Sequence, residues 1–223
     1  MNQEEIKEEI QGLVSCKDEE IQGISASCKD EEIQVSSFDT DNLLPNSISL
    51  IIGDAKTGKS LLIKDLLVGI TTSNLIKSGM ACVDSSQLPF YSKFIDDSSL
   101  YKRYSSLLAS RCYNDNTFLI LDYYFYSKEK YTEIYENSQK KKMVVLVSLK
   151  TFTDFTDYKY IFITKLENLE ELIKVYDTYI KSKNFNMSLE QFVHLLNYLD
   201  KNEVLVINCK AKSLEQLFFS YLP

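Results

Sequence analysis

Several residue types that often carry chemistry are scarce in this chain of 223 residues. It has one histidine, two arginines and six glycines, and its five cysteines are scattered, with no C-x-x-C pair and no nearby histidine. That pattern argues against structural zinc and against a disulfide framework. No apolar run approaches the roughly 18 residues that a membrane-spanning helix needs, and the N-terminus is acidic. We therefore expect a cytoplasmic protein in a reducing compartment, with no membrane partner.

The formal net charge of −7 is concentrated at one end of the chain. Residues 1–41 hold twelve acidic residues against three lysines, whereas residues 42–223 hold 20 acidic and 22 basic residues. The larger part is thus close to neutral, so its charge neither indicates nor excludes nucleic acid as a partner.

The acidic N-terminal stretch contains a tandem repeat. The sequence SCKDEEIQ at residues 15–22 recurs unchanged at residues 27–34. Such short acidic units bury too little apolar surface to fold alone, so we predict that residues 1–44 form a disordered arm and residues 45–223 one folded domain. The alternative is a short helix that docks on a protein partner. Deleting residues 1–40 is predicted to leave the thermal stability nearly intact.

One segment matches a motif with a defined chemistry, the Walker A phosphate loop (P-loop) G-x-x-x-x-G-K-[ST]. It consists of Gly53, Asp54, Ala55, Lys56, Thr57, Gly58, Lys59 and Ser60. In this motif backbone N–H groups surround the phosphates of a nucleoside triphosphate, the lysine reaches the β and γ oxygens, and the serine hydroxyl ligates Mg²⁺. We therefore predict that this segment binds a nucleoside triphosphate and Mg²⁺.

The residues around the motif fit its structural context. The apolar run 47–52 predicts a buried strand, and residues 58–76 predict an amphipathic helix. Its apolar residues at helical spacing are Leu61, Leu62, Leu66 and Ile70.

Strands and helices are predicted to alternate along the rest of the chain. The expected strands are 79–84, 117–122, 143–149, 158–164 and 203–208, and the expected helices are 98–112, 127–142, 168–183, 188–199 and one from residue 213 onward. This order indicates an α/β fold with a mainly parallel sheet covered by helices on both faces, as in P-loop NTPases. The phosphate loop would then lie at the carboxyl end of its strand, where ligands bind in such sheets.

A P-loop site needs a second carboxylate that holds Mg²⁺ through water, delivered by the end of a neighbouring strand. Asp122 ends the apolar run 117–122, so we assign it to the metal site and, with Lys59, to catalysis. The alternative is an aspartate that caps the next turn. Many P-loop ATPases carry an acid directly after this aspartate, but here the residue is Tyr123, and nothing in the spacing singles out Glu129 or Asp84 as a replacement.

Other candidate residues have a plainer explanation. Arg103 and Arg111 could supply charge to the γ-phosphate of a neighbouring subunit, but solvated helix positions explain them better. His194 fits a helix surface or the edge of the core better than a ligand role. The aromatic run 123–126 fits packing better than base stacking.

In order and spacing these features resemble the poxvirus-type genome-packaging ATPases of the FtsK/HerA superfamily. The resemblance covers roughly residues 46–210, from the phosphate loop through the Asp122 strand to a closing strand, helix and strand. It implies a viral hydrolase that couples ATP hydrolysis to moving double-stranded DNA into a capsid, as a homo-oligomeric ring in a host-cell virus factory or the virion. The family usually carries two acids where this chain has Asp122 and Tyr123. It usually has a glutamine that senses the γ-phosphate where this chain has Ser148 and Leu149.

Both departures remove groups that act on the attacking water or the cleaved phosphate. The alternative is therefore a catalytically degenerate nucleotide-binding scaffold whose acidic arm binds a protein partner. A small-molecule kinase ranks last, because both arginines precede Asp122 and provide no lid over the phosphates. For a DNA motor, Lys140, Lys141 and Lys142 are candidates for the DNA path, although a solvated helix end explains them more simply.

Overall fold

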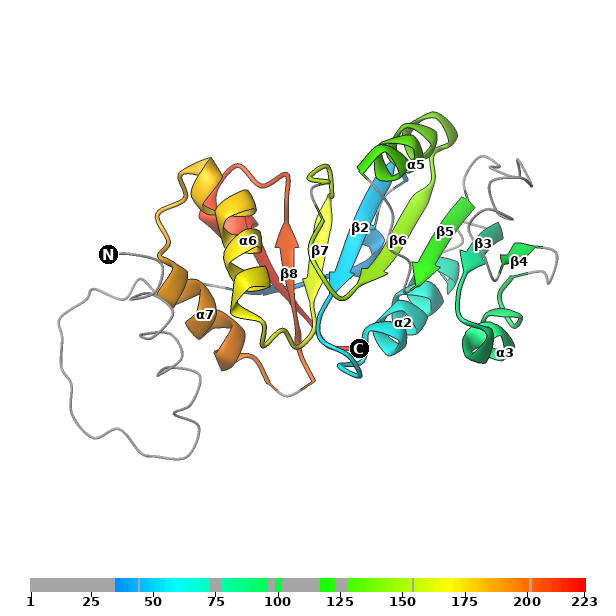
Figure 1. The fold of residues 1–223 in the computed structure, drawn as a ribbon, viewed down its shortest axis with the longest axis horizontal. Helices are drawn as coiled ribbons and strands as arrows, with labels where there is room; N and C mark the ends of the chain where they lie inside the picture. Colours follow the sequence, from blue (N-terminus) through cyan, green and yellow to red (C-terminus); the bar gives the residue numbers. More distant parts are fainter. Residues whose placement is uncertain are drawn as a thin grey trace.

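The computed structural model describes residues 35–43, 45–72, 78–95, 99–101, 117–122, 128–153, 155–200 and 202–223. These residues form an open sheet with helices packed along it (Figure 1). Of the predicted helix 98–112 only residues 99–101 are described, and there Leu100–Tyr101 forms a strand instead of a helix, because it pairs with the edge of the sheet. Arg103 and Arg111, the aromatic run 123–126 and the acidic repeats lie outside the described residues.

The nine strands of the described residues form a mainly parallel sheet. They are β1 Ser36–Ser37, β2 Ser47–Ile52, β3 Ser78–Cys82, β4 Leu100–Tyr101, β5 Thr117–Asp122, β6 Val144–Leu149, β7 Tyr160–Ile163, β8 Val204–Asn208 and β9 Phe218–Tyr221. Their order is β1-β9-β8-β7-β2-β6-β5-β3-β4, and only β8 pairs antiparallel to its two neighbours. This confirms the predicted α/β fold.

The helices cover both faces of the sheet, as predicted. They are α2 Lys59–Thr72, α3 Leu88–Tyr91, α5 Lys128–Lys141, α6 Leu169–Tyr179 and α7 Leu189–Tyr198. Successive strand residues point to opposite faces, so a strand buried on both faces contributes side chains to two hydrophobic cores. On β2, Leu50 packs in the core beneath α5, α6 and α7, whereas Ile51 packs in the core beneath α2 and α3. Strands buried on both faces read as continuous apolar runs, which is why β2 and β5 were recognisable.

Local signals fix the ends of two helices. The Asn168 side chain caps α6 by accepting a hydrogen bond from Glu170 N, and Ser188 and Gln191 form a capping box at the start of α7. α6 ends at Tyr179, earlier than predicted, and is followed by a 3-10 turn, Lys181–Lys183. Among the described residues no helix is long and apolar enough to cross a membrane.

Several predictions from sequence were wrong. A helix was expected from residue 213, but a 3-10 turn, Leu214–Gln216, leads into β9, which pairs antiparallel with β8. The aromatic and β-branched neighbours in the sheet stabilise an extended segment here, and this tertiary pairing outweighs local helix preference. Of the four apolar residues at helical spacing in α2, Leu62, Leu66 and Ile70 are buried, whereas Leu61 is 67% exposed.

The folded part of the chain also begins earlier than predicted. β1 pairs with β9, and Phe38, only 4% exposed, lies edge-on to aromatic rings of β7 and β9. Leu43 is buried in the same core. The boundary at residue 45 therefore falls inside the packed region, and a deletion of residues 1–40 would remove core contacts.

Candidate functional site

The phosphate loop connects β2 to α2 at the carboxyl edge of the sheet, and both motif glycines have a structural reason. Gly58 has a φ of +88°, a conformation that residues with a Cβ rarely adopt. A Cβ on Gly53 would lie 2.0 Å from Thr164 Oγ1 and 2.9 Å from the Lys165 carbonyl oxygen, so the side chains and backbone around it leave no room for a side chain. The Gly58 carbonyl then accepts from Leu62 N at 2.9 Å as α2 begins.

Lys59 lies inside this loop. Its side chain is 1% exposed, and its Nζ donates to the carbonyl oxygens of Gly53 at 2.7 Å and Asp54 at 2.5 Å. Burial lowers the pKa of Lys59 below its ordinary value, while the negative charges of Asp122 and Asp54 oppose this shift. The loop thus holds a buried cation whose partners are backbone carbonyls, which phosphate oxygens can replace.

Asp122 reaches the phosphate loop from the end of β5. Ser60 Oγ donates to Asp122 Oδ2 at 2.9 Å, so the two residues predicted to bind the metal are in direct contact. β5 is not the neighbour of β2, contrary to our expectation, because β6 lies between them. Contact is still possible because α2 packs on the sheet face to which Asp122 belongs, together with Ile120 of β5.

The Asp122 carboxylate is fully buried, and burial raises its pKa above the ordinary 3.8. Hydrogen bonding to Ser60, the adjacent Ser148 hydroxyl and the positive charges of Lys59 and Lys64 favour the charged form. Within the described residues, Asp122 Oδ1 and Ser148 Oγ have no hydrogen-bond partner of standard geometry. Buried polar atoms normally have partners, so these oxygens, with Ser60 Oγ, fit a small hard cation such as Mg²⁺.

On the opposite side of β2, the segment after β7 contacts the phosphate loop through hydrogen bonds. Thr57 Oγ1 lies 2.8 Å from Thr164 Oγ1, Asp54 N donates to the Lys165 carbonyl at 2.8 Å, and Glu167 N donates to Asp54 Oδ2 at 2.7 Å. Sequence reasoning missed these contacts. The available signal was the position of Thr164 at the end of the predicted strand 158–164, because parallel strands end at the same edge of a sheet.

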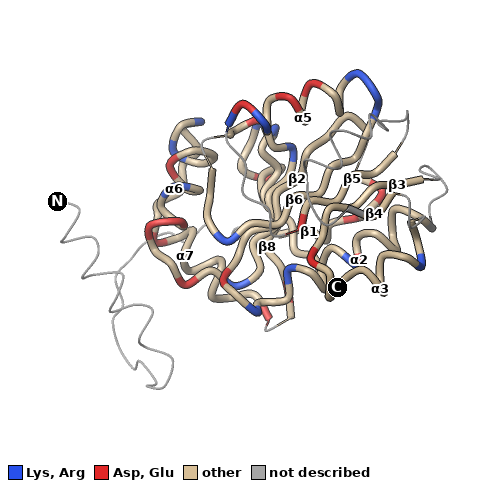
Figure 2. Tube along the Cα trace, turned by 45° about the vertical axis from the view of Figure 1, so that its right-hand side comes forward, with Lys and Arg blue, Asp and Glu red and all other residues tan. Residues whose placement is uncertain are grey.

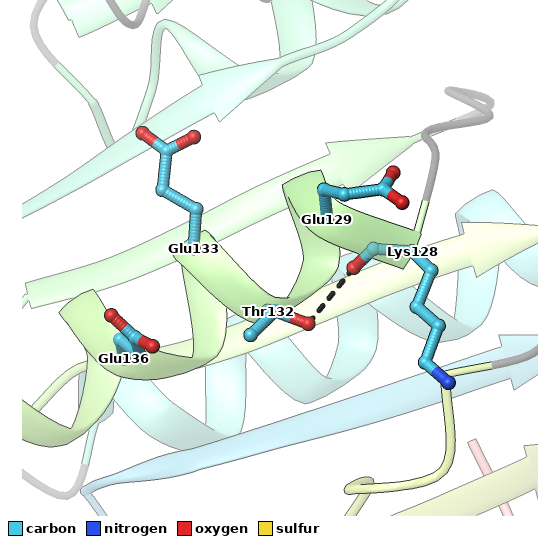
Figure 3. A pocket seen from close by; sticks show the side chains of 5 residues that line it. All are labelled: Lys128, Glu129, Thr132, Glu133 and Glu136. Atoms are coloured by element: carbon cyan, nitrogen blue, oxygen red, sulfur yellow. Dashed lines mark hydrogen bonds between the residues drawn. The ribbon is translucent and has the colours of Figure 1, made fainter.

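The other candidate residues lie elsewhere. The Asp84 carboxylate accepts a hydrogen bond from Ser86 N, which lowers its pKa and makes it a turn cap. Glu129 lies on the first turn of α5, beside a pocket that shares no residue with the phosphate loop (Figure 3). This pocket is lined by Lys128, Glu129, Thr132, Glu133 and Glu136.

The lone histidine and the lysine run lie on the surface. His194 is exposed on α7, with its ring centroid 6.3 Å from that of Tyr198, as expected for a helix-surface residue. Lys140 and Lys141 form the basic last turn of α5, after its acidic residues (Figure 2). Among the described residues no group of three or more His, Cys, Asp or Glu side chains has the arrangement of a metal site.

The fold and the phosphate-loop geometry together define an α/β protein of the P-loop NTPase class. No protein-family model and no curated protein sequence matches the chain. Solved structures do match, and they include viral genome-packaging NTPases, in agreement with the resemblance found in the sequence.

Three structures illustrate the likeness. The genome packaging NTPase B204 of Sulfolobus turreted icosahedral virus 2, in complex with sulfate, matches with a TM-score of 0.59 and 18% identity over 80% of this chain and 97% of that chain. The DNA-packaging ATPase B204 of Sulfolobus turreted icosahedral virus gives 0.58 and 17%, over 80% and 98%. The virus 2 protein in complex with ATP-gammaS gives 0.57 and 17%, over 79% and 97%. At this identity the likeness concerns the fold.

Proposed function

We propose that this protein binds ATP and Mg²⁺ at residues 53–60 and hydrolyses ATP to drive double-stranded DNA into a viral capsid. The observation that carries the nucleotide site is the 2.9 Å hydrogen bond from Ser60 to Asp122, which joins the phosphate loop to the end of β5. The proposed task rests on the likeness to B204, which is described as a genome packaging NTPase and has been crystallised with ATP-gammaS.

Each residue of the site has a defined role in this proposal. The backbone N–H groups of residues 53–60 bind the phosphates, and Lys59 exchanges its carbonyl partners for β and γ oxygens. Ser60 ligates Mg²⁺ directly and Asp122 holds it through water. The cation, when bound, supplies charge neutralisation at the phosphates. Because Lys59 and Asp122 are buried, their charges act on the phosphates with little screening by water.

A second function is favoured by the end of β6. Leu149 is 3% exposed and packs in the core on the face opposite α2, so the last strand residue presents no polar group to the phosphates. Ser148 is the polar residue there, and a serine hydroxyl is a poor base. The alternative is therefore a scaffold that binds ATP without rapid turnover and recruits a protein partner through its acidic residues 1–34.

The assembly and the DNA path belong to the proposal as well. We propose a homo-oligomeric ring that acts in a host-cell virus factory or the virion and contacts DNA phosphates through Lys140, Lys141 and Lys142. Phosphate contacts carry little sequence information and release counterions, so DNA binding should be sequence-tolerant and should weaken steeply with salt.

The deciding experiment is steady-state ATP hydrolysis by the full chain, with and without double-stranded DNA. Lys59→Ala is expected to abolish ATP binding and turnover, whereas Lys212→Ala, which removes an exposed lysine beyond the other end of the sheet, should behave as wild type. DNA-stimulated turnover supports the packaging motor, and ATP binding without turnover supports the scaffold. Tight ATP binding that persists in Lys59→Ala contradicts both.

A further inference from the structure

Lys150 is placed at the phosphate loop by the register of the sheet. In the parallel pairing of β2 with β6, Leu149 lies opposite Ile52, the last residue before the loop. Lys150 follows Leu149, as Gly53 follows Ile52, so each of the two residues comes directly after the last pair of the register, at the carboxyl edge. Lys150 therefore comes level with the residue whose carbonyl accepts the bond from Lys59.

The alternation of β6 places Lys150 on the same face as the site. Val144 and Leu146 pack in the core with α2, whereas Val145 and Val147 pack in the core on the other face. Ser148, opposite Asp122 in the register, continues the first series, and extending the alternation by one residue beyond the end of β6 puts Lys150 next in it. The positive charge of Lys150 accordingly acts on Lys59 and adds to the lowering of the pKa of Lys59.

The segment that carries Lys150 is anchored on both sides. β6 holds it from one side, and on the other Phe152 N donates a hydrogen bond to the Glu171 carboxylate of α6. Glu171 is 4% exposed and forms an ion pair with Lys174 at 2.8 Å. A buried, paired carboxylate is costly to rearrange, so it fixes the path of the chain two residues after Lys150.

We propose that Lys150 is a second phosphate-binding cation, whose ammonium group contacts the γ-phosphate of a bound nucleoside triphosphate. This inference rests on the proposed nucleotide site. Two like charges on one face repel each other, and an anion between them relieves that repulsion. Lys59 is buried inside the loop, where it would meet the β and γ oxygens, whereas Lys150 is exposed at the carboxyl edge and free to reach the terminal phosphate from outside the loop. Lys150 would thereby favour a triphosphate over a diphosphate.

The test is equilibrium binding of ADP and of a non-hydrolysable ATP analogue to the full chain in Mg²⁺. In Lys150→Gln the dissociation constant of the analogue should rise about tenfold, as for loss of one hydrogen bond between charged groups, while that of ADP should change less than about twofold. Lys150→Arg, which keeps the charge, should restore most of the preference. Lys212→Gln, the matched removal of a remote exposed lysine, should leave both constants unchanged. Thermal unfolding verifies that each variant is folded.

The outcomes separate this inference from the proposed function. If wild type binds the analogue but Lys150→Gln affects both nucleotides equally, or neither, Lys150 is a solvated lysine and the inference is wrong. If wild type binds neither nucleotide, the proposed nucleotide site fails, and the role of Lys150 fails with it.

Discussion

The phosphate loop makes different kinds of contact on the two sides of β2. On the β6 and β5 side, the loop meets the side chains of Ser148 and Asp122. Among the described residues Asp122 Oδ1 and Ser148 Oγ have no hydrogen-bond partner of standard geometry. On the β7 side, it meets hydroxyl and backbone groups that are satisfied by one another, from Thr164 to Glu167.

This difference suggests that the β5 and β6 side binds the ligand and that the β7 side stabilises the loop. Buried polar atoms without partners cost stability, so the β5 and β6 side is less stable without a ligand than its packing alone would allow. The satisfied contacts on the β7 side stabilise the shape of the loop instead. Substitutions on the two sides should therefore affect different quantities: cation-dependent binding on one, loop rigidity or fold stability on the other.

The largest effect is expected from Phe38→Ala, which weakens the support of β7. The Phe38 ring lies 5.0 Å from that of Tyr160 and 5.2 Å from that of Phe162, both in β7. Removing a buried phenylalanine side chain costs about 3–5 kcal/mol of unfolding free energy. For a domain of this size the thermal midpoint should fall by roughly 6–20 °C, as measured by circular dichroism.

Deleting residues 1–34 provides the comparison, because it keeps Phe38 and β1. We expect that variant to unfold within a few degrees of wild type. Leu222→Ala, which shortens a side chain that is 68% exposed, controls for loss of apolar surface as such. A small effect of Phe38→Ala would mean that the N-terminal segment does not support β7.

The next largest effect is expected on Mg²⁺-dependent ATP binding, from Asp122→Asn on the β5 and β6 side of the loop. Loss of the carboxylate should weaken Mg²⁺-dependent ATP binding by about 10- to 100-fold, as for removal of a partner that holds a metal through an outer contact. Titrating Mg²⁺ at fixed nucleotide measures this change. Asp84→Asn, which alters a carboxylate that caps a turn, should leave the Mg²⁺ dependence unchanged.

The same substitution should have the opposite effect on stability, with a defined pH dependence. Burial raises the pKa of Asp122 above 3.8, so between that value and the raised one the native state binds more protons than the unfolded state. Stability attributable to this group therefore falls as pH rises through that window, and asparagine, which does not ionise, escapes the loss. The midpoint of Asp122→Asn relative to wild type should increase from pH 4 upward; a decrease would show that the charged carboxylate stabilises the fold.

Features set by local sequence could be predicted, whereas features that depend on contacts between distant segments could not. Two apolar runs in the sequence predict the bounds of β2 and β5. The contact of Ser60 with Asp122 follows from the motif, because both residues are expected to bind the same metal ion. The chain order of strands does not reveal their order in the sheet, so the position of β6 between β2 and β5 was not foreseen.

Contacts between distant segments left no local signal. β9 lies in a short aromatic stretch without a clear period, and its pairing with β8 and β1 depends on residues far away in sequence. The hydroxyls of Thr57 and Thr164 are 107 residues apart in the chain. A threonine after a strand is common, so its partner is apparent only once both strands end at the same edge.

The smallest effect is expected from Thr164→Val, which keeps the shape of the side chain and removes the hydroxyl on the β7 side. Thr57 Oγ1 then loses its 2.8 Å partner but keeps its bond to the Asp54 carbonyl at 2.9 Å, so the loop loosens without losing its path. One neutral hydrogen bond contributes about 0.5–1.5 kcal/mol, so binding of ADP and of an ATP analogue should weaken equally, by roughly 2- to 12-fold. The Mg²⁺ dependence should stay that of wild type, since no group on the β5 and β6 side changes.

Thr153→Val, which removes a buried hydroxyl bonded to Tyr158 away from the loop, is the matched control and should not alter binding. A shifted Mg²⁺ dependence in Thr164→Val would show that the two sides of β2 are coupled through the loop, and the assignment of ligand binding to one side and loop stability to the other would then be wrong.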